Sequence, residues 1–525
     1  MMKRLEKPRW QAHHQKRLYP YVLLVFLGLL LPILAGSVYF FRGYVPSGFN
    51  LGSLLPLKQP EIRGNEIVVR AGADFQAALD RAKPGDTILL QAGATFRGDF
   101  KLPKKSGFQF ITIRSSAADA QLPPAGQRID PKRYQAVLPK LKPNGKGEPT
   151  IATTAGAHHY RFIGVEFQAT VEGLYNIVQI GSGEETNVND IPHHLEFDRV
   201  YIHGDKQYGQ RRGIAANGRD IRIVNSYISD IKRIGEESQA IAVWATDGPI
   251  EIENNYLEAA AMSVLFGGAG APLKLVPTNC IVKNNWMNKP LEWRNEDWVV
   301  KNIFEIKNGK NIRVTNNLMT NNWIMGQEGT AVLFTTRADN PNAEVTNILF
   351  ENNIIRGTGS AINIWGGEGN GGHDLTIKNN IFADLGEKWG GAGFFLKTSG
   401  WKGLTVENNT VENTGNITLA YGEPVSGFIF RNNIVSQNEY GMFGDGIGSG
   451  MLALKTYFPG AVVTNNIIIG GSAADYGKSN FYPASARQLG LDKNLQFQPG
   501  NVYLTRGYGG KPVGAVLDAK TVGGN

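Results

Sequence analysis

The chain has 525 residues, 42% of them hydrophobic, and a formal net charge of +8. The first 58 residues contain eight Lys or Arg residues but only one Asp or Glu residue. The rest of the chain is therefore nearly neutral, and the excess charge does not indicate a nucleic-acid-binding surface. The single cysteine, Cys280, excludes an internal disulfide framework.

The N-terminal segment predicts a membrane anchor. Residues 1–17 are basic, residues 18–41 carry no charge, and Arg42 follows. An uncharged helix of 24 residues would be about 36 Å long, enough to cross a hydrocarbon core of about 30 Å. The basic residues before the span favour a cytoplasmic N-terminus. The alternative is a cleaved signal peptide, since Ala35-Gly36-Ser37 resembles a cleavage site.

After a linker at residues 42–60, the pattern indicates the start of a domain. Asp74 precedes the apolar residues Phe75, Ala78 and Leu79, so we expect it to cap a short amphipathic helix. Residues 87–90 are the first predicted strand and residues 110–114 the first full repeat strand, followed by a loop insertion at residues 117–150. A helix at this position would cover the open end of a solenoid.

A strand that ends in asparagine recurs through the rest of the chain, as in NIFEIKNGKNIRVTNN at residues 302–317. The first asparagine of each ending lies at 225, 254, 284, 316, 352, 379, 408, 432 and 465. Repeats of 24 to 36 residues, each with two or three short strands, predict a solenoid of β-coils. Asparagine tolerates a left-handed backbone, and we expect the side-chain amides to form a buried ladder at one corner.

These features resemble bacterial right-handed parallel β-helix proteins of the pectin-lyase-like superfamily. The resemblance rests on the capping-helix segment, the asparagine endings and the sequence GKPVGA at residues 510–515. It implies an all-β solenoid at residues 61–490 with a C-terminal end or cap segment at 491–525. Together with the anchor, it places a single-pass protein in the bacterial inner membrane, with the body in the periplasm or outside the cell. The fold hosts lyases, hydrolases, epimerases and binding proteins, so it does not define an activity.

Several site patterns are absent from the sequence: Asp-Asp, Asn-Thr-Asp, Asp-Pro-His and any Cys/His metal spacing. The pairs His158-His159 and His193-His194 lack companion ligands in the sequence, and we interpret them as structural or solvated.

A surface stripe remains as the candidate site. Alignment of the inward pairs Ile241/Val243, Phe304/Ile306, Val332/Phe334, Ile362/Ile364 and Phe394/Leu396 predicts two outward rows. The row after the pairs is Trp244, Lys307, Thr335, Trp365 and Lys397, and the row between them is Ala242, Glu305, Leu333, Asn363 and Phe395. Aromatic rings and cations suit an acidic polysaccharide, and Trp244, Trp365, Lys397 and Asn363 are the predicted substrate-binding residues. Packing beneath a loop is the alternative for the aromatic residues.

Within this stripe, the run from Lys307 to Asn311 resembles the Lys-Ser-x-x-Asn run of the alginate lyase and chondroitinase B family. The resemblance implies that Lys307 is the base of a β-elimination, that Arg337 assists, and that Glu305 is a calcium ligand. Further ligands would have to come from the acidic residues of the 292–297 insertion. Asn308 replaces the serine of the family. A surface ion pair between Glu305 and Lys307 is the alternative.

The sequence thus predicts a membrane-anchored, monomeric β-helix protein that acts on or binds an acidic polysaccharide and has no nucleic-acid partner. One hypothesis is a calcium-assisted lyase that cleaves a uronic-acid polymer by β-elimination. The other is a non-catalytic carbohydrate-binding or cell-envelope scaffold protein.

Overall fold

The computed structural model describes residues 64–145, 147–169, 175–517 and 522–523. The predicted anchor at residues 18–41 and the linker at 42–60 lie outside these ranges. Among the described residues, no helix is both long and apolar enough to cross a membrane.

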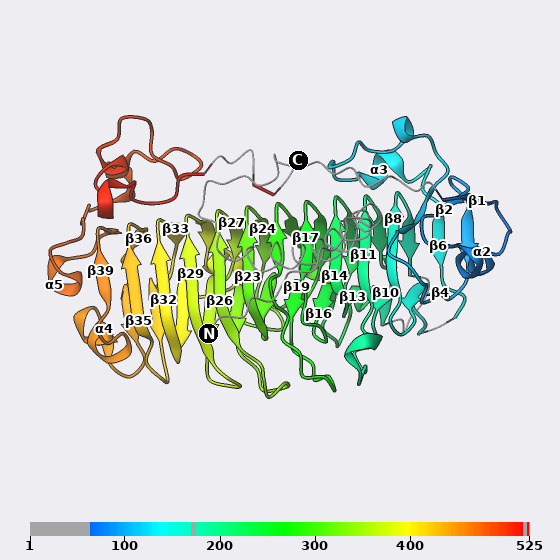
Figure 1. The fold of residues 1–525 in the computed structure, drawn as a ribbon. Helices are drawn as coiled ribbons and strands as arrows, with labels where there is room; N and C mark the ends of the chain where they lie inside the picture. The colour runs from blue at the N-terminus through cyan, green and yellow to red at the C-terminus, as the bar shows by residue number, and fades with distance from the viewer. Residues whose placement is uncertain (1–63, 146, 170–174, 518–521, 524–525) are drawn as a thin grey trace, which may run out of the picture. The chain divides into compact units, whose positions relative to one another are not determined.

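Three elongated sheets, here called A, B and C, run side by side (Figure 1). Sheet A contains, in spatial order, β1 (Glu66–Val69), β2 (Thr87–Leu90), β5 (Ile111–Ser115), β8 (His158–Ile163), β11 (His193–Asp198), β14 (Arg219–Val224), β17 (Ile250–Glu253), β20 (Ile281–Lys283), β23 (Gly309–Thr315), β26 (Val345–Glu351), β29 (Gly372–Lys378), β32 (Trp401–Glu407), β35 (Ser426–Arg431) and β39 (Val462–Thr464). Sheet B contains β3 (Thr95–Arg97), β6 (Lys140–Lys142), β9 (Glu166–Gln168), β12 (Tyr201–His203), β15 (Tyr227–Ile231), β18 (Tyr256–Ala259), β21 (Trp286–Asn288), β24 (Leu318–Asn322), β27 (Ile354–Thr358), β30 (Ile381–Leu385), β33 (Thr410–Asn413), β36 (Ile434–Ser436) and β40 (Ile467–Ile469).

Sheet C contains β4 (Phe100–Leu102), β7 (Ile151–Thr153), β10 (Asn176–Ile180), β13 (Arg212–Ala216), β16 (Gln239–Val243), β19 (Met262–Phe266), β22 (Phe304–Ile306), β25 (Thr330–Thr335), β28 (Ser360–Trp365), β31 (Leu396–Ser399), β34 (Thr418–Ala420), β37 (Met442–Gly444) and β38 (Gly448–Ser449). Among the described strands, each pairs in parallel with its sheet neighbours, except that β38 is antiparallel to β37. One coil therefore takes one strand from each sheet, in the chain order C, A, B.

The core follows from the alternation of side chains along each strand. In β23, Ile312 and Val314 are fully buried, whereas Arg313 between them is exposed. The same positions in the next coil, Ile348 and Phe350, pair with them in register and are also buried. Because parallel coils repeat this register, the inward side chains stack into one continuous apolar core.

The asparagine endings form the corner between sheets A and B, and their two residues have different roles. The first asparagine of each ending has a φ of 53–59° and is the left-handed residue that turns the chain. The second is buried, and its backbone N–H and Nδ2 donate to the Oδ1 of the equivalent residue in the next coil at 2.8–3.0 Å. The predicted ladder therefore exists, but the second asparagine forms it; Asn379, a first asparagine expected to be buried, is only partly so.

Both ends of the solenoid carry helices (Figure 1). Helix α2 (Phe75–Arg81) has Asp74 as its N-cap and packs on β1 and β4, as the sequence predicts. Strand β1 precedes the predicted first strand, which is β2. The insertion after β5 contains α3 (Pro131–Tyr134), and α4 (Met451–Tyr457) and α5 (Ala473–Tyr476) lie near the other end.

The chain then turns back over the coils, with 3₁₀ turns at Ala486–Leu489, Val502–Leu504 and Tyr508–Gly510. Three further 3₁₀ turns lie at Val188–Asp190, Leu291–Asn295 and Glu387–Trp389, and one at Asp119–Gln121. The returning segment lies along the asparagine corner: the Nδ2 of Asn408 donates to the carbonyl of Pro512 at 2.6 Å, and Asn379 Oδ1 accepts from the backbone N–H of Val516 at 2.8 Å.

Candidate functional site

The outward face of sheet C contains the predicted site residues in two rows. The row between the inward pairs runs, one residue per coil, through Leu265, Glu305, Leu333, Asn363 and Lys397. The alignment predicted Phe395 for the last coil, but Leu396 pairs with Ile362, so the register is shifted by two residues. Phe395 is consequently buried in the core, and Lys397 lies beside Asn363 rather than in the row of Trp365.

Glu305 and Lys307 form a buried ion pair at the centre of this face. Lys307 Nζ lies 3.7 Å from Glu305 Oε1, and the two side chains are only 14% and 2% exposed. The hydroxyl of Thr335 donates to the same carboxylate oxygen at 3.4 Å. Within the described residues, Glu305 Oε2 has no hydrogen-bond partner. The pair is therefore not a solvated surface contact, because both charges are largely withdrawn from water.

Arg337, Asn363 and Lys397 meet at a cavity of about 210 Å³ next to this pair. The Arg337 guanidinium lies 4.5 Å from the centre of the Trp365 ring. Lys397 Nζ contacts both oxygens of Glu328, at 3.0 and 2.8 Å. The cavity is also lined by Gln327, Glu328, Thr330, Leu333 and Thr335. Two cations, two side-chain amides and the carboxylate paired with Lys397 thus face one small hollow. Its cations are the groups that can bind the carboxylate of a sugar.

Trp244 does not share this cavity. It follows β16, four strands from the strand that contains Trp365, which is about 19 Å at the usual strand spacing. The Arg212 guanidinium lies 5.1 Å from the centre of its ring. The structure thus brings together six of the seven predicted residues, Glu305, Lys307, Arg337, Asn363, Trp365 and Lys397, and places Trp244 elsewhere on the same face.

The residues around Glu305 supply few ligands for calcium. Calcium takes about six to eight oxygen ligands, whereas this carboxylate faces a lysine and a threonine. The insertion expected to supply further carboxylates does not reach it, because Glu292 and Glu296 line a cavity on sheet B. Calcium binding at Glu305 therefore stays a prediction.

That cavity on sheet B, of about 510 Å³, was not predicted. The backbone N–H of Asp230 donates to Glu258 Oε1 at 3.1 Å, and the hydroxyl of Tyr256 donates to Glu258 Oε2 at 2.9 Å. Burial raises the pKa of Glu258 to about 7 and also raises the pKa of Asp230. Lys232 lies 3.6 Å from Asp230 and within 5 Å of the rings of Trp293 and Trp298.

A carboxyl group that titrates near neutral pH in a cavity is a common feature of acid–base sites. The sequence offered little indication of this cavity, because a register shift between Ile228 and Ile231 displaces Asp230 from the regular alternation of inward and outward residues in its strand.

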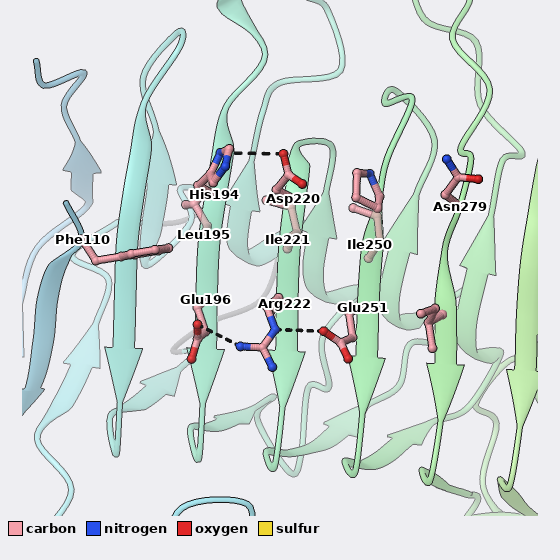
Figure 2. A pocket seen from close by; sticks show the side chains of 12 residues that line it. Phe110, His194, Leu195, Glu196, Asp220, Ile221, Arg222, Ile250, Glu251 and Asn279 are labelled. Atoms are coloured by element: carbon pink, nitrogen blue, oxygen red, sulfur yellow. Dashed lines mark hydrogen bonds and ion pairs between the residues drawn. The ribbon is translucent and has the colours of Figure 1, made fainter. Parts of the chain in front are cut away.

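A third hollow, of about 340 Å³, lies on the outward face of sheet A. Arg222 bridges Glu196 and Glu251 at 3.1 and 2.9 Å across its floor, and His194 faces Asp220 at 3.7 Å on its rim (Figure 2). The charges on its floor are paired with one another, as Lys397 and Glu328 are in the sheet C cavity. The sheet C cavity differs in that Arg337 has no carboxylate partner among the described residues.

Comparison with known proteins supports the fold. A family model described as a right-handed β-helix region matches residues 339–483. None of the curated protein sequences compared with the chain matches it. The structure is thus a right-handed parallel β-helix, as the sequence predicts.

Solved structures with some likeness include three lyases. The PL6 family alginate lyase AlyGC is 15% identical with a TM-score of 0.35, and the match covers 82% of this chain and 50% of that one, so this chain spans half its length. An alginate lyase from Paenibacillus sp. FPU-7 is 15% identical with a TM-score of 0.32, and the match covers 69% of this chain and 95% of that one. A mannuronic-acid-specific family 6 lyase from human gut microbiota is 12% identical with a TM-score of 0.38, and the match covers 82% of this chain and 85% of that one. At these identities and scores, the likeness assigns no activity to this chain.

Proposed function

We propose that this protein binds an acidic polysaccharide along the outward face of sheet C. The observation that carries the proposal is the cavity at which Arg337, Asn363 and Lys397 converge. Strands repeat about every 4.8 Å along the face, so an extended sugar chain can contact several coils at once. Guanidinium and ammonium groups are matched to carboxylates, and the amide of Asn363 can bond to hydroxyls.

The ion pairs of this face fit reversible ligand binding. Lys397 is held by Glu328, whose side chain is 68% exposed, so a ligand carboxylate can replace Glu328 without uncovering a buried charge. Arg337 is held against Trp365 by a cation–π contact, and its Nη1 donates to the carbonyl of Thr336 at 3.2 Å. These contacts order the guanidinium at the cavity and leave its other N–H groups for a ligand. Trp365 also supplies an apolar surface on which a sugar ring can stack.

The finer proposal is cleavage of a uronic-acid polymer by β-elimination, with Lys307 as the base. In that reaction the base removes the proton next to the carboxylate and a C4–C5 double bond forms. The C4–O bond to the leaving sugar breaks, and the leaving oxygen takes up a proton. Arg337 would stabilise the negative charge that develops on the carboxylate. Lys307 must first lose its own proton to solvent and leave its contact with Glu305, because only a neutral amine can accept the proton.

The non-catalytic alternative needs no such rearrangement. The buried Glu305–Lys307 pair would then hold the binding face in shape, and Arg337 and Lys397 would contact the polymer directly. In both cases residues 18–41 are proposed to anchor the chain in the bacterial inner membrane, with the β-helix in the periplasm or outside the cell.

Titration of the full-length chain with size-matched oligomannuronate, oligogalacturonate and neutral oligoglucan tests the proposal. We expect binding of at least one uronate oligomer, weakened by salt, and no binding of the glucan. Equal binding of the neutral oligomer, or no binding of any of the three, would contradict the proposal. Absorbance of the unsaturated product in the same samples tests β-elimination separately.

A further inference from the structure

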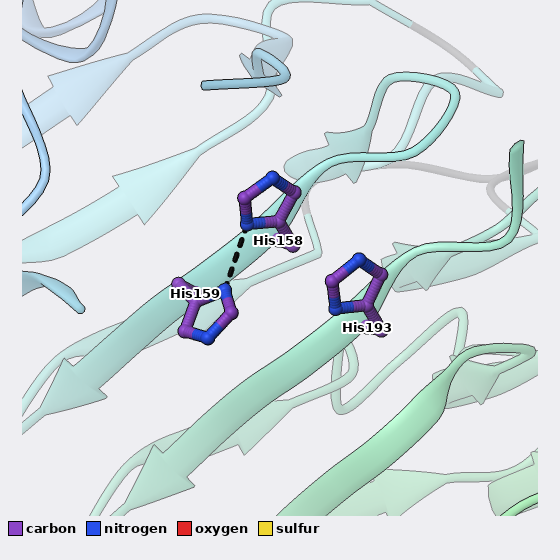
Figure 3. Close-up of side chains that lie close together, drawn as sticks. All are labelled: His158, His159 and His193. Atoms are coloured by element: carbon purple, nitrogen blue, oxygen red, sulfur yellow. Dashed lines mark hydrogen bonds between the residues drawn. The ribbon is translucent and has the colours of Figure 1, made fainter. Parts of the chain in front are cut away.

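Two histidine pairs from consecutive coils lie together at the start of β8 and β11. His158 pairs in register with His193, and therefore His159 with His194. Neighbouring residues in a strand normally point to opposite faces. Here His159 and His194 have φ values of 57° and 54°, and the two rings of each pair come together instead. Nδ1 of His158 lies 2.7 Å from Nδ1 of His159, with His193 beside them (Figure 3). Nδ1 of His193 lies 2.8 Å from Nδ1 of His194.

The backbone at this corner does not require histidine. The equivalent residues of other coils are Asp220, Asn279, Asn311, Asn347 and Asp374, with φ values of 52–58°. In two later coils the residue is glycine, Gly403 or Gly427. Asparagine, aspartate and glycine adopt left-handed φ at little energetic cost. Histidines in two consecutive coils therefore add ring nitrogens that the turn itself does not need.

The rings are stacked between coils, which brings their nitrogens into one small volume. His158 and His193 are stacked 4.7 Å apart, and His159 and His194 are stacked 4.5 Å apart. One ligand atom from each of His158, His159 and His193 lies within 4.8 Å of the others, and the described ranges hold no other group of three or more His, Cys, Asp or Glu residues arranged in this way.

We propose that His158, His159 and His193 bind one divalent transition-metal ion, with zinc as the best-suited ion. Imidazole is a preferred ligand of zinc, and a tetrahedral ion with Zn–N distances of about 2.0–2.1 Å separates its ligand nitrogens by about 3.3 Å. To reach this spacing, the 2.7 Å contact between His158 and His159 must open, and the wider separations in the group, up to 4.8 Å, must close. Ion binding therefore requires the stacked rings of His158 and His193 to rotate toward a common point.

The surroundings support a metal with one open position. Of the nearby cations, Arg219 is paired with Asp247, to which it donates at 2.5 and 2.9 Å. The side chains of His158 and His193 are half-buried, so water can reach the cluster as a fourth ligand.

Zinc binding to the full-length chain tests this proposal, with two double variants. Calorimetric titration should give one tight zinc per wild-type chain, and the His158→Ala/His193→Ala variant should lose about 100-fold or more in affinity. His13→Ala/His14→Ala is the matched control, because it removes the other His-His pair of the sequence, and it should bind zinc as the wild type does.

A measurement on the wild type avoids dependence on the folding of the variant. Zinc should protect His158, His159 and His193, but not His373, from modification by diethylpyrocarbonate, as read by peptide mass spectrometry. The proposal is overturned if the wild type binds no zinc, if the control variant rather than the His158/His193 variant loses it, or if zinc leaves the modification of these three histidines unchanged.

Discussion

Asn380 and Asn409 are joined by two hydrogen bonds, because the backbone N–H and the Nδ2 of Asn380 both donate to Asn409 Oδ1 at 3.0 Å. Both side chains are fully buried. Nδ2 of Asn380 also donates to the carbonyl of Phe350 at 3.0 Å, so one amide connects three consecutive coils. The contact repeats along the corner and fixes the register of sheet A against sheet B.

This relationship predicts a large difference between two adjacent asparagines. Asn380→Leu leaves the backbone groups and amides of its neighbours without partners, and should lower the free energy of unfolding by about 3 kcal/mol or more. Asn379→Gly should have an effect below about 1 kcal/mol, because glycine keeps the left-handed turn and Asn379 is only partly buried. Urea unfolding of both variants measures this, and equal losses would show that the second asparagine is not the structural one.

A second prediction concerns Glu258 and pH. Its pKa is raised by burial from about 4.5 to about 7, so the native state retains a proton that the unfolded state has lost. The free energy of unfolding should therefore fall as pH rises from about 4.5 to 7, by about 2–3 kcal/mol, and change no further through this group above pH 7. Glu258→Gln should remove this fall, whereas Glu66→Gln on the exposed side of β1 should not. Identical pH profiles for wild type and Glu258→Gln would contradict the prediction.

A third prediction concerns the N-terminus. The uncharged segment 18–41 behind a basic tail predicts an uncleaved anchor, so the chain recovered from membranes should retain residues 1–17. Mass spectrometry of the N-terminal peptide is the measurement. A chain that starts near residue 37 would show that the segment is a cleaved signal peptide.

A fourth prediction concerns turnover. If Lys307 is the base of a β-elimination, Lys307→Ala should abolish formation of unsaturated product while polymer binding persists. Trp365→Ala should weaken binding by about 1–2 kcal/mol because it removes a stacking surface. Chelation of calcium should lower turnover if Glu305 holds the ion. Undiminished turnover by Lys307→Ala would exclude its role as base, and polymer binding without turnover by the wild type would favour the non-catalytic alternative.

The fold could be predicted from the sequence because the residues of each coil carry the pattern that defines it. Alternating apolar residues such as Ile312 and Val314, followed by two asparagines, specify both the inward face and the corner. The sequence predicted the sheet C residues for the same reason, since Glu305, Leu333 and Asn363 lie one per coil between the inward pairs, and Lys307 directly follows such a pair.

The errors came from register, which depends on contacts between coils. Lys397 was assigned to the wrong row because Phe394/Leu396 has the same alternation as the true pair, Leu396/Thr398. His159 and His194 are 35 positions apart, and only their left-handed φ values and the stacking of β8 on β11 bring their rings together. A histidine pair in a single strand gives no sign of this, because neighbouring side chains are expected on opposite faces.

The most direct test of the central claim is uronate binding by three single variants of the full-length chain. Arg337→Ala and Lys397→Ala remove the cations of the sheet C cavity, and Lys402→Ala removes an exposed lysine of sheet A as the control. Binding at the cavity predicts that the first two weaken affinity by about 5- to 30-fold, or about 1–2 kcal/mol, and that the control binds as the wild type does. Unchanged affinity in both cavity variants, or an equal loss in all three, would show that the polymer does not bind at this site.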